Sequence, residues 1–137
     1  MPIFELRNRG ASIDMSGDDI NYYTIISKLL ALEVGKACGP DCIQASVIKE
    51  CAYELALPMT LTYRASIETS ELPIQWRSAN VCPIFKKGDR LVAGNYRPVS
   101  LTAILCKVIE SVVREKMQRY FYDNQLISSK QHGFVKH

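Results

Sequence analysis

Apolar residues near the start of the chain recur every three or four positions, a spacing that places them on one face of a helix. They are Ile20, Tyr23, Ile26, Leu30 and Val34. Asp18 and Asp19 lie at the start of this pattern and suit the positive end of a helix dipole, while Gly35 suits a carboxyl-terminal cap. The pattern predicts a first helix between these two signals.

A second helical pattern follows the loop at residues 36–42, which contains Gly39-Pro40-Asp41. Its inward positions are Val47, Ile48, Cys51, Ala52 and Leu55. Pro58 interrupts the pattern, and proline is tolerated in the first turn of a helix but not in its interior. We therefore expect Pro58 to begin a further helix that continues to about Thr69.

The hydrophobic period changes beyond residue 73. Residues 78–85 predict a strand, in which Pro83 favours an edge position because proline cannot donate to a ladder. Residues 86–95 carry the glycines and polar residues of a long hairpin turn, and residues 96–101 predict the return strand. Pro98 in the second strand predicts an irregular ribbon.

The pattern then predicts a long helix, capped by Thr102 and ending near Asp123 at Asn124. Its apolar stripe consists of Leu105, Val108, Ile109, Val112, Val113 and Tyr120. Four charged residues have the spacing of supportive ion pairs, namely Glu110 with Arg114 and Glu115 with Arg119. Ser128 and Gln131 have capping-box spacing and predict the start of a short last helix.

These elements predict an α+β fold that is mostly helical, with one β-ribbon. The 137 residues, 47% of them apolar, suffice for one core. Residues 1–15 show no period and are expected to form a flexible tail, which leaves residues 16–137 as the domain. Neither a bilayer-length apolar run nor a secretion signal occurs, so we expect an intracellular protein, nuclear or cytoplasmic, with no membrane contact.

The cysteines do not predict a disulfide framework. Their number is odd, and they are Cys38, Cys42, Cys51, Cys82 and Cys106. Reduced thiols in an intracellular compartment explain them best. A zinc site needs four ligands at matched spacing, and the only histidines are His132 and His137, so no metal site is predicted.

Charge is distributed unevenly along the chain. Residues 1–76 hold six Lys and Arg against ten Asp and Glu, whereas residues 77–137 hold eleven against four. A basic second half favours a polyanionic partner such as nucleic acid or nucleotide. A solvated basic surface without a partner explains the charge equally well.

Four strings stand in an order that resembles one family. They are GKACGPDCIQASVIKECAYELALPMTLTY, SELPIQWRSANVCPIFKKGD, NYRPVSLTAILCKVIESVVREKM and SSKQHGFVKH. This combination resembles reverse transcriptases (RNA-directed DNA polymerases) of non-LTR, LINE-like retrotransposons, from about Asp19 to the end of the chain. The resemblance implies that residues 16–137 are a partial reverse transcriptase domain, comprising the fingers and the start of the palm.

The resemblance also implies a role for the hairpin. Lysine supplies a mobile point charge and arginine a planar fork, both suited to phosphate oxygens. By motif position, Lys86, Lys87 and Arg97 match the residues that bind the phosphates of the incoming nucleotide, and the choice between the two lysines stays open. The alternative is that Lys86 and Lys87 are solvated turn residues and that Arg97 is structural, but the motif positions favour the phosphate-binding role.

Near the end of the chain, Gln131, Gly133 and Phe134 match a segment that lies near template or nucleotide in the family. Val135 replaces the arginine that usually follows the phenylalanine, so one phosphate-contacting charge is lost. Cys42 replaces the usual glycine of GPDG, and would be strained if its position requires a positive φ.

No catalytic residue is predicted in this chain. The family uses a YxDD-type aspartate pair and an earlier aspartate to hold two Mg²⁺ ions. Asp18-Asp19 opens a helix instead, and suits a helix terminus. We expect this fragment to bind no cofactor and to be inactive alone, while Mg²⁺, RNA template, DNA primer and dNTP are implied for the intact polymerase.

Two other functions are compatible with the sequence. One is a non-catalytic nucleic-acid-binding module derived from a retrotransposon, which the basic second half favours. The other is a helical protein-interaction module. Trp76 is expected to pack between helices and ribbon rather than to stack on a base. The sequence does not determine the oligomeric state.

Overall fold

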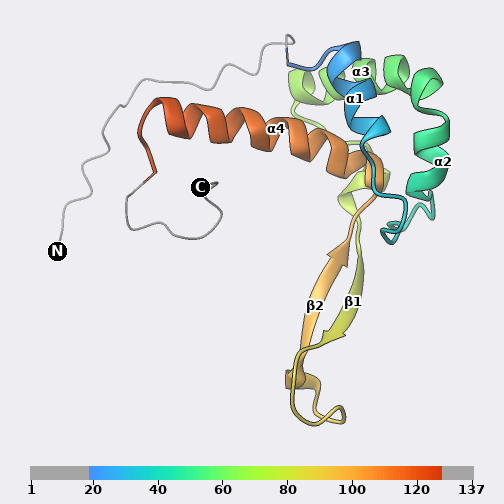
Figure 1. The fold of residues 1–137 in the computed structure, drawn as a ribbon, viewed down its shortest axis with the longest axis vertical. Coiled ribbons are helices and arrows are strands. Elements are labelled where there is room, and N and C mark those ends of the chain that lie inside the picture. Colours follow the sequence, from blue (N-terminus) through green and yellow to red (C-terminus); the bar gives the residue numbers. More distant parts are fainter. Residues whose placement is uncertain (1–18, 128–137) are drawn as a thin grey trace.

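The computed structural model describes residues 19–127. The elements are α1 (Tyr22–Leu30), α2 (Ala45–Glu50), α3 (Ala52–Thr69), η1 (Ile74–Arg77), β1 (Asn80–Phe85), η2 (Ala93–Asn95), β2 (Tyr96–Leu101) and α4 (Ile104–Asp123). The helices form one body, and the two strands form a ribbon that projects away from it (Figure 1). The mostly helical α+β fold with one ribbon is confirmed, whereas the expected tail at residues 1–15 and the short helix from Ser128 lie outside the described residues.

Helix α1 and its lead-in bury only part of the predicted face: Ile20 is buried and Ile26 packs against the core. Ile25 and Leu29 are fully buried, whereas Tyr23 is 80% exposed and Val34 lies exposed beyond the helix end. The predicted residues and the fully buried residues both have helical spacing. Packing of α1 against α3 determines which of them are buried. The helix ends after Leu30 rather than at Gly35.

The amino-terminal cap of α1 is Asn21, whose side chain accepts a hydrogen bond from the Thr24 amide at 2.9 Å. Asp19 does not cap this helix, and its carboxylate forms an ion pair with Lys116 of α4. An acidic residue predicted to act locally therefore connects two elements that are far apart in the sequence.

Pro58 lies inside α3 instead of beginning a helix, and the break between α2 and α3 falls at Cys51. The missing amide of Pro58 removes only the bond to the carbonyl of Glu54. Both residues are exposed, so water can satisfy that carbonyl. The buried hydroxyl of Thr60 donates to the Ala56 carbonyl at 2.7 Å in the same part of the helix.

The core lies between α1, α3 and α4. Its fully buried members of largest volume are Tyr63, Ile20, Ile25, Leu29 and Ile48. The Tyr63 hydroxyl donates to the Leu105 carbonyl at 2.7 Å and so joins α3 to α4. Burial raises the pKa of Tyr63, because a phenolate would be desolvated there. Trp76 packs against this tyrosine with ring centroids 5.5 Å apart, as expected for a packing residue.

Helix α4 begins at Ile104, and Thr102 does not cap it: the capping position is Ala103, which has no side-chain bond to offer. Most of the predicted stripe is buried or partly buried, together with Ile104 and Cys106, which the pattern did not include. Glu115 pairs with Lys28 of α1 at 2.8 Å rather than with the expected Arg119. Glu115 thus bonds to a lysine of a neighbouring helix and not to an arginine of its own helix.

Gly39 sits where the loop at residues 36–42 crosses the beginning of α4. A β-carbon on Gly39 would lie 2.4 Å from the Ala103 nitrogen and 2.5 Å from the Thr102 carbonyl carbon. The turn that follows closes with a bond from the Cys42 amide to the Gly39 carbonyl, and Cys42 has φ 55°. The condition under which a cysteine at this position would be strained is therefore met.

Replacing Gly39 with alanine should lower the free energy of unfolding by about 2–3 kcal/mol, because the new methyl group meets backbone that cannot move aside. Urea denaturation followed by circular dichroism measures this change. The control is Gly35→Ala, since no atom lies within 4 Å of a β-carbon there. Equal stability of the two variants would contradict the close approach.

Replacing Cys42 with glycine should raise the free energy of unfolding by about 1 kcal/mol, because relief of left-handed strain exceeds the added freedom of the unfolded chain. The matched control is Cys51→Gly, an equally exposed cysteine at φ −94°, where glycine brings no such relief. A lower denaturation midpoint for Cys42→Gly would contradict the assignment of strain.

Candidate functional site

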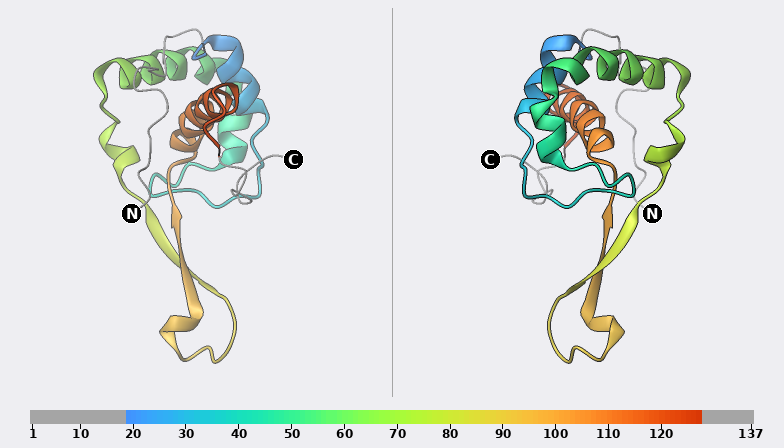
Figure 2. Two further views of the ribbon diagram at one scale, coloured as in Figure 1. Left: turned by 90° about the vertical axis from the view of Figure 1, so that its left-hand side faces the viewer. Right: turned by 90° about the vertical axis from the view of Figure 1, so that its right-hand side faces the viewer.

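The ribbon is a regular antiparallel ladder of six residue pairs, from Asn80 opposite Leu101 to Phe85 opposite Tyr96. The predicted strands and the turn at residues 86–95 are confirmed, apart from residues 78 and 79, which precede β1. The turn lies at the end of the ribbon farthest from the helices, in all three views (Figures 1 and 2).

Pro83 and Pro98 stand directly opposite each other in this ladder. The Lys86 amide donates to the Asn95 carbonyl at 2.8 Å, which makes that pair a hydrogen-bonded one. Hydrogen-bonded and non-hydrogen-bonded pairs alternate, so the two prolines form a non-hydrogen-bonded pair and their nitrogens face outward. The expectation of an irregular ribbon was therefore wrong. Each outer edge also lacks a donor at its middle, which discourages addition of another strand.

Three residues of the motifs shape the turn. Gly88 has φ 91°, and a β-carbon there would lie 2.8 Å from the Asn95 side chain. The Asn95 amide donates to the Asp89 carbonyl at 2.7 Å, and the Asp89 carboxylate accepts from the Leu91 amide at 2.9 Å. The glycine and aspartate of KKGD and the asparagine of NYRP thus hold the turn, as the glycines and polar residues of 86–95 predicted.

The proposed phosphate-binding cations lie at the outer part of the ribbon. Arg97 stands opposite Ile84, and Lys86 is two residues beyond Ile84, so alternation of side chains places Lys86 and Arg97 on the same face. Lys87 belongs to the turn. All three are exposed, and within residues 19–127 no hydrogen bond or ion pair engages their side chains.

Arg90 lies on the other face of the ribbon. Its guanidinium carbon is 5.2 Å from the centroid of the Phe85 ring, and Phe85 contacts Tyr96 edge-on at 5.5 Å between centroids. A shallow hollow of about 260 Å³ lies here, lined by Pro83, Arg90, Leu91, Ala93 and Tyr96. Lys86, Lys87 and Arg97 do not line this hollow, so the hairpin cations are divided between two faces.

Carboxylates for metal chemistry do not gather in the described part of the chain. No group of three or more His, Cys, Asp or Glu residues that could hold a metal ion occurs within residues 19–127. Asp19 is paired with Lys116 instead. The described residues therefore do not fit the two-metal site of a polymerase.

The buried Cys106 is not suited to act as a nucleophile. Burial, followed by the charge and hydrogen bond of Glu110, raises the pKa of Cys106 to about 11. This thiol stays protonated near neutral pH, and the nucleophile in thiol chemistry is the thiolate. The other four cysteines are partly or fully exposed and free.

The remaining predicted residues, Gln131, Gly133 and Phe134, lie outside the described residues, as do His132 and His137. None of the helices within residues 19–127 is long and apolar enough to cross a membrane.

No family model matches the chain. It is 25% identical over 111 residues, 80% of its length, to a probable RNA-directed DNA polymerase from transposon BS of Drosophila melanogaster. It is 23% identical over 128 residues, 93% of its length, to the corresponding probable polymerase from transposon X-element of the same species. It is also 25% identical over 107 residues to a retrovirus-related Pol polyprotein from type-1 retrotransposable element R1 of Bradysia coprophila.

These similarities confirm the resemblance to non-LTR retrotransposon reverse transcriptases. The matched region covers most of the chain but only 12%, 14% and 11% of the three relatives. The chain therefore corresponds to a small part of a polymerase of this kind.

Proposed function

We propose that this chain is the fingers part of an RNA-directed DNA polymerase, and that its ribbon binds the phosphates of the incoming nucleotide. The observation that carries the proposal is the placement of Lys86 and Arg97 on one face of a projecting ribbon, where neither charge has a partner among residues 19–127. The similarity to non-LTR polymerases supports the choice of a nucleotide over other anions.

Alternation along β1 favours Lys86 over Lys87 as the lysine that acts with Arg97. The arginine offers two parallel donors to phosphate oxygens, and the lysine adds a point charge beside it. Strand β2 holds the backbone of Arg97, and the bond from the Lys86 amide to the Asn95 carbonyl holds that of Lys86, so little backbone freedom is lost on binding. Lys87, at the start of the turn, adds positive charge that attracts the anion over a longer range.

The chemical step belongs to other parts of the intact polymerase. Mg²⁺ held by aspartates would supply phosphoryl transfer there, and the residues described in this chain contribute binding and orientation of the nucleotide. Gln131, Gly133 and Phe134 are proposed to contact the RNA template, along which the DNA primer is extended.

Replacing Arg97 with alanine should weaken binding of a deoxynucleoside triphosphate about tenfold, since one charge-assisted bond at an exposed site contributes about 1.4 kcal/mol. Titration of the isotope-labelled chain, followed by backbone NMR, measures the affinity. The wild-type chain should show shift changes confined to residues 86–97.

Lys36→Ala is the matched control, because Lys36 is an exposed lysine that pairs with Glu33 on the helical body. The nucleoside without phosphates should cause no shift. If the triphosphate binds wild type and Arg97→Ala equally, or shifts only residues outside the ribbon, phosphate binding by the ribbon is excluded.

The purified chain should incorporate no nucleotide in a primer-extension assay on an RNA template with Mg²⁺, because its described residues hold no carboxylate cluster for the metal ions. A full-length polymerase of the same type serves as the positive control. Extension above background by this chain alone would refute its assignment as a non-catalytic part.

A further inference from the structure

Helix α3 carries an apolar stripe that faces solvent. Tyr53, Leu57 and Leu61 are 64%, 56% and 59% exposed, and their spacing of four residues places them on one face of the helix. Ala65, one turn further along, is exposed as well. Apolar side chains that are exposed in a continuous row, rather than singly, mark an interaction surface.

The exposed charges beside this stripe are acidic. Glu54 and Glu68 lie on the same face of α3, and Glu50 ends α2 just before it; all three are exposed. None of the three forms an ion pair within residues 19–127. Arg64, the one cation of α3, is turned away from the stripe, and its Nε donates to the Ile20 carbonyl at 2.7 Å. The outer face of α3 is therefore an apolar surface bordered by negative charge.

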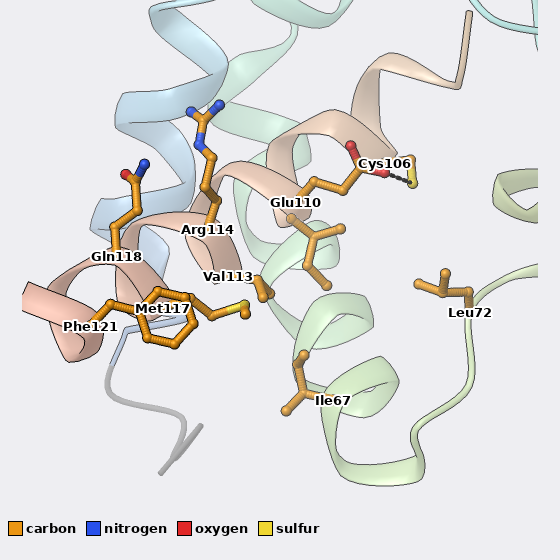
Figure 3. Close-up of a pocket in the computed structure, with 10 residues that line it drawn as sticks. Ile67, Leu72, Cys106, Glu110, Val113, Arg114, Met117, Gln118 and Phe121 are labelled. Carbon is orange, nitrogen blue, oxygen red and sulfur yellow. Dashed lines mark hydrogen bonds between the residues drawn. The ribbon is translucent and has the colours of Figure 1, made fainter. Parts of the chain in front are cut away.

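The charge of this surface restricts the kind of partner that fits it. Carboxylates repel nucleic acid and anionic membrane surfaces. A second copy of the chain would bring the same acidic residues to the contact and no outward cation to pair with them. The groove between α3 and α4 differs, because charges of both signs, Glu110 and Arg114, line it beside Met117 and Phe121 (Figure 3). That groove specifies no partner charge, whereas the stripe calls for a basic partner.

We propose that the outer face of α3 docks a basic amphipathic helix of a second protein. Side chains spaced four residues apart form a ridge, and such a ridge packs into the groove between the ridges of another helix. The partner helix places apolar side chains against Leu57 and Leu61, and lysine or arginine side chains against Glu54 and Glu68. From Tyr53 to Glu68 the surface is about 22 Å long, which matches about four turns of a partner helix.

This docking does not depend on nucleotide binding by the ribbon. Helix α3 lies at the end of the helical body away from the hairpin turn (Figures 1 and 2). A helix docked on α3 would therefore leave Lys86 and Arg97 accessible. The acidic face of α3 and the cations of the ribbon thus suit two ligands of opposite charge, which can bind at the same time.

The test uses a helical peptide of leucine, lysine and alanine with the 18-residue length of α3, its leucines on one face and its lysines beside them. Titration of the isotope-labelled chain, followed by NMR, should shift the resonances of Tyr53, Leu57 and Leu61. Leu57→Ser should weaken binding about tenfold and leave the circular dichroism spectrum unchanged, because this side chain is already exposed. Leu91→Ser is the matched control, since Leu91 is an exposed leucine of the hairpin turn, and should bind as wild type does.

The role of charge is tested with a second peptide, which carries glutamate in place of lysine and should not bind. Glu54→Gln should weaken binding of the lysine peptide about threefold at low salt. Equal binding of the two peptides would overturn the proposal, as would resonance shifts centred on Met117 and Phe121 of the groove.

Sedimentation of the chain without peptide should show a monomer. A dimer that Leu57→Ser abolishes would assign the stripe to a second copy and would also overturn the proposal. The nucleotide titration of the ribbon is a separate measurement, so either result can fail without the other.

Discussion

The position of the ribbon depends on how its two roots are held against the helical body. Before β1, Trp76 packs on the buried Tyr63, whose hydroxyl binds the Leu105 carbonyl of α4. After β2, the backbone at Thr102 and Ala103 passes so close to Gly39 that no side chain fits between them. Both contacts involve buried groups or backbone, and such groups move little. A ribbon fixed at both roots projects in a defined direction, which a pair of free strands would not do.

A fixed ribbon matters for the proposed phosphate binding, because the cations lie at its outer end. Lys86 and Arg97 would gain from such binding only if their spacing is set before the anion arrives, since each long side chain otherwise loses freedom on binding. The turn contributes through the left-handed backbone of Gly88, beside the Asn95 side chain, and through the bond from Asn95 to the Asp89 carbonyl. The prolines at 83 and 98 stand at positions where no ladder bond is lost. Within the same motifs, Lys86 and Arg97 thus supply the positive charge, and other residues hold the turn that positions it.

The helical body has a complementary role. The ion pairs Lys28–Glu115 and Asp19–Lys116 join α4 to the amino-terminal part of the fold, and the apolar core lies beneath them. The opposite side of α4 carries an apolar groove, to which Val113, Met117 and Phe121 contribute. Helix α4 therefore joins the ribbon at its start to the core along one side.

The sequence by itself determined the type and order of the elements. Change of period marked the ribbon, turn residues marked its hairpin, and motif order carried the resemblance to non-LTR polymerases. Placement of Lys86, Lys87 and Arg97 on the hairpin also followed from the sequence. Tertiary structure alone decided which face of α1 is buried, because two interleaved apolar sets have the same helical spacing and only packing against α3 distinguishes them. It also decided that Pro58 remains inside α3, since solvent can satisfy the carbonyl that proline leaves free. The division of the cations between two faces required the strand register, and a shift of one residue would have reversed it. Local pattern fixes what a segment can form, and contacts between segments select among the arrangements that the pattern permits equally.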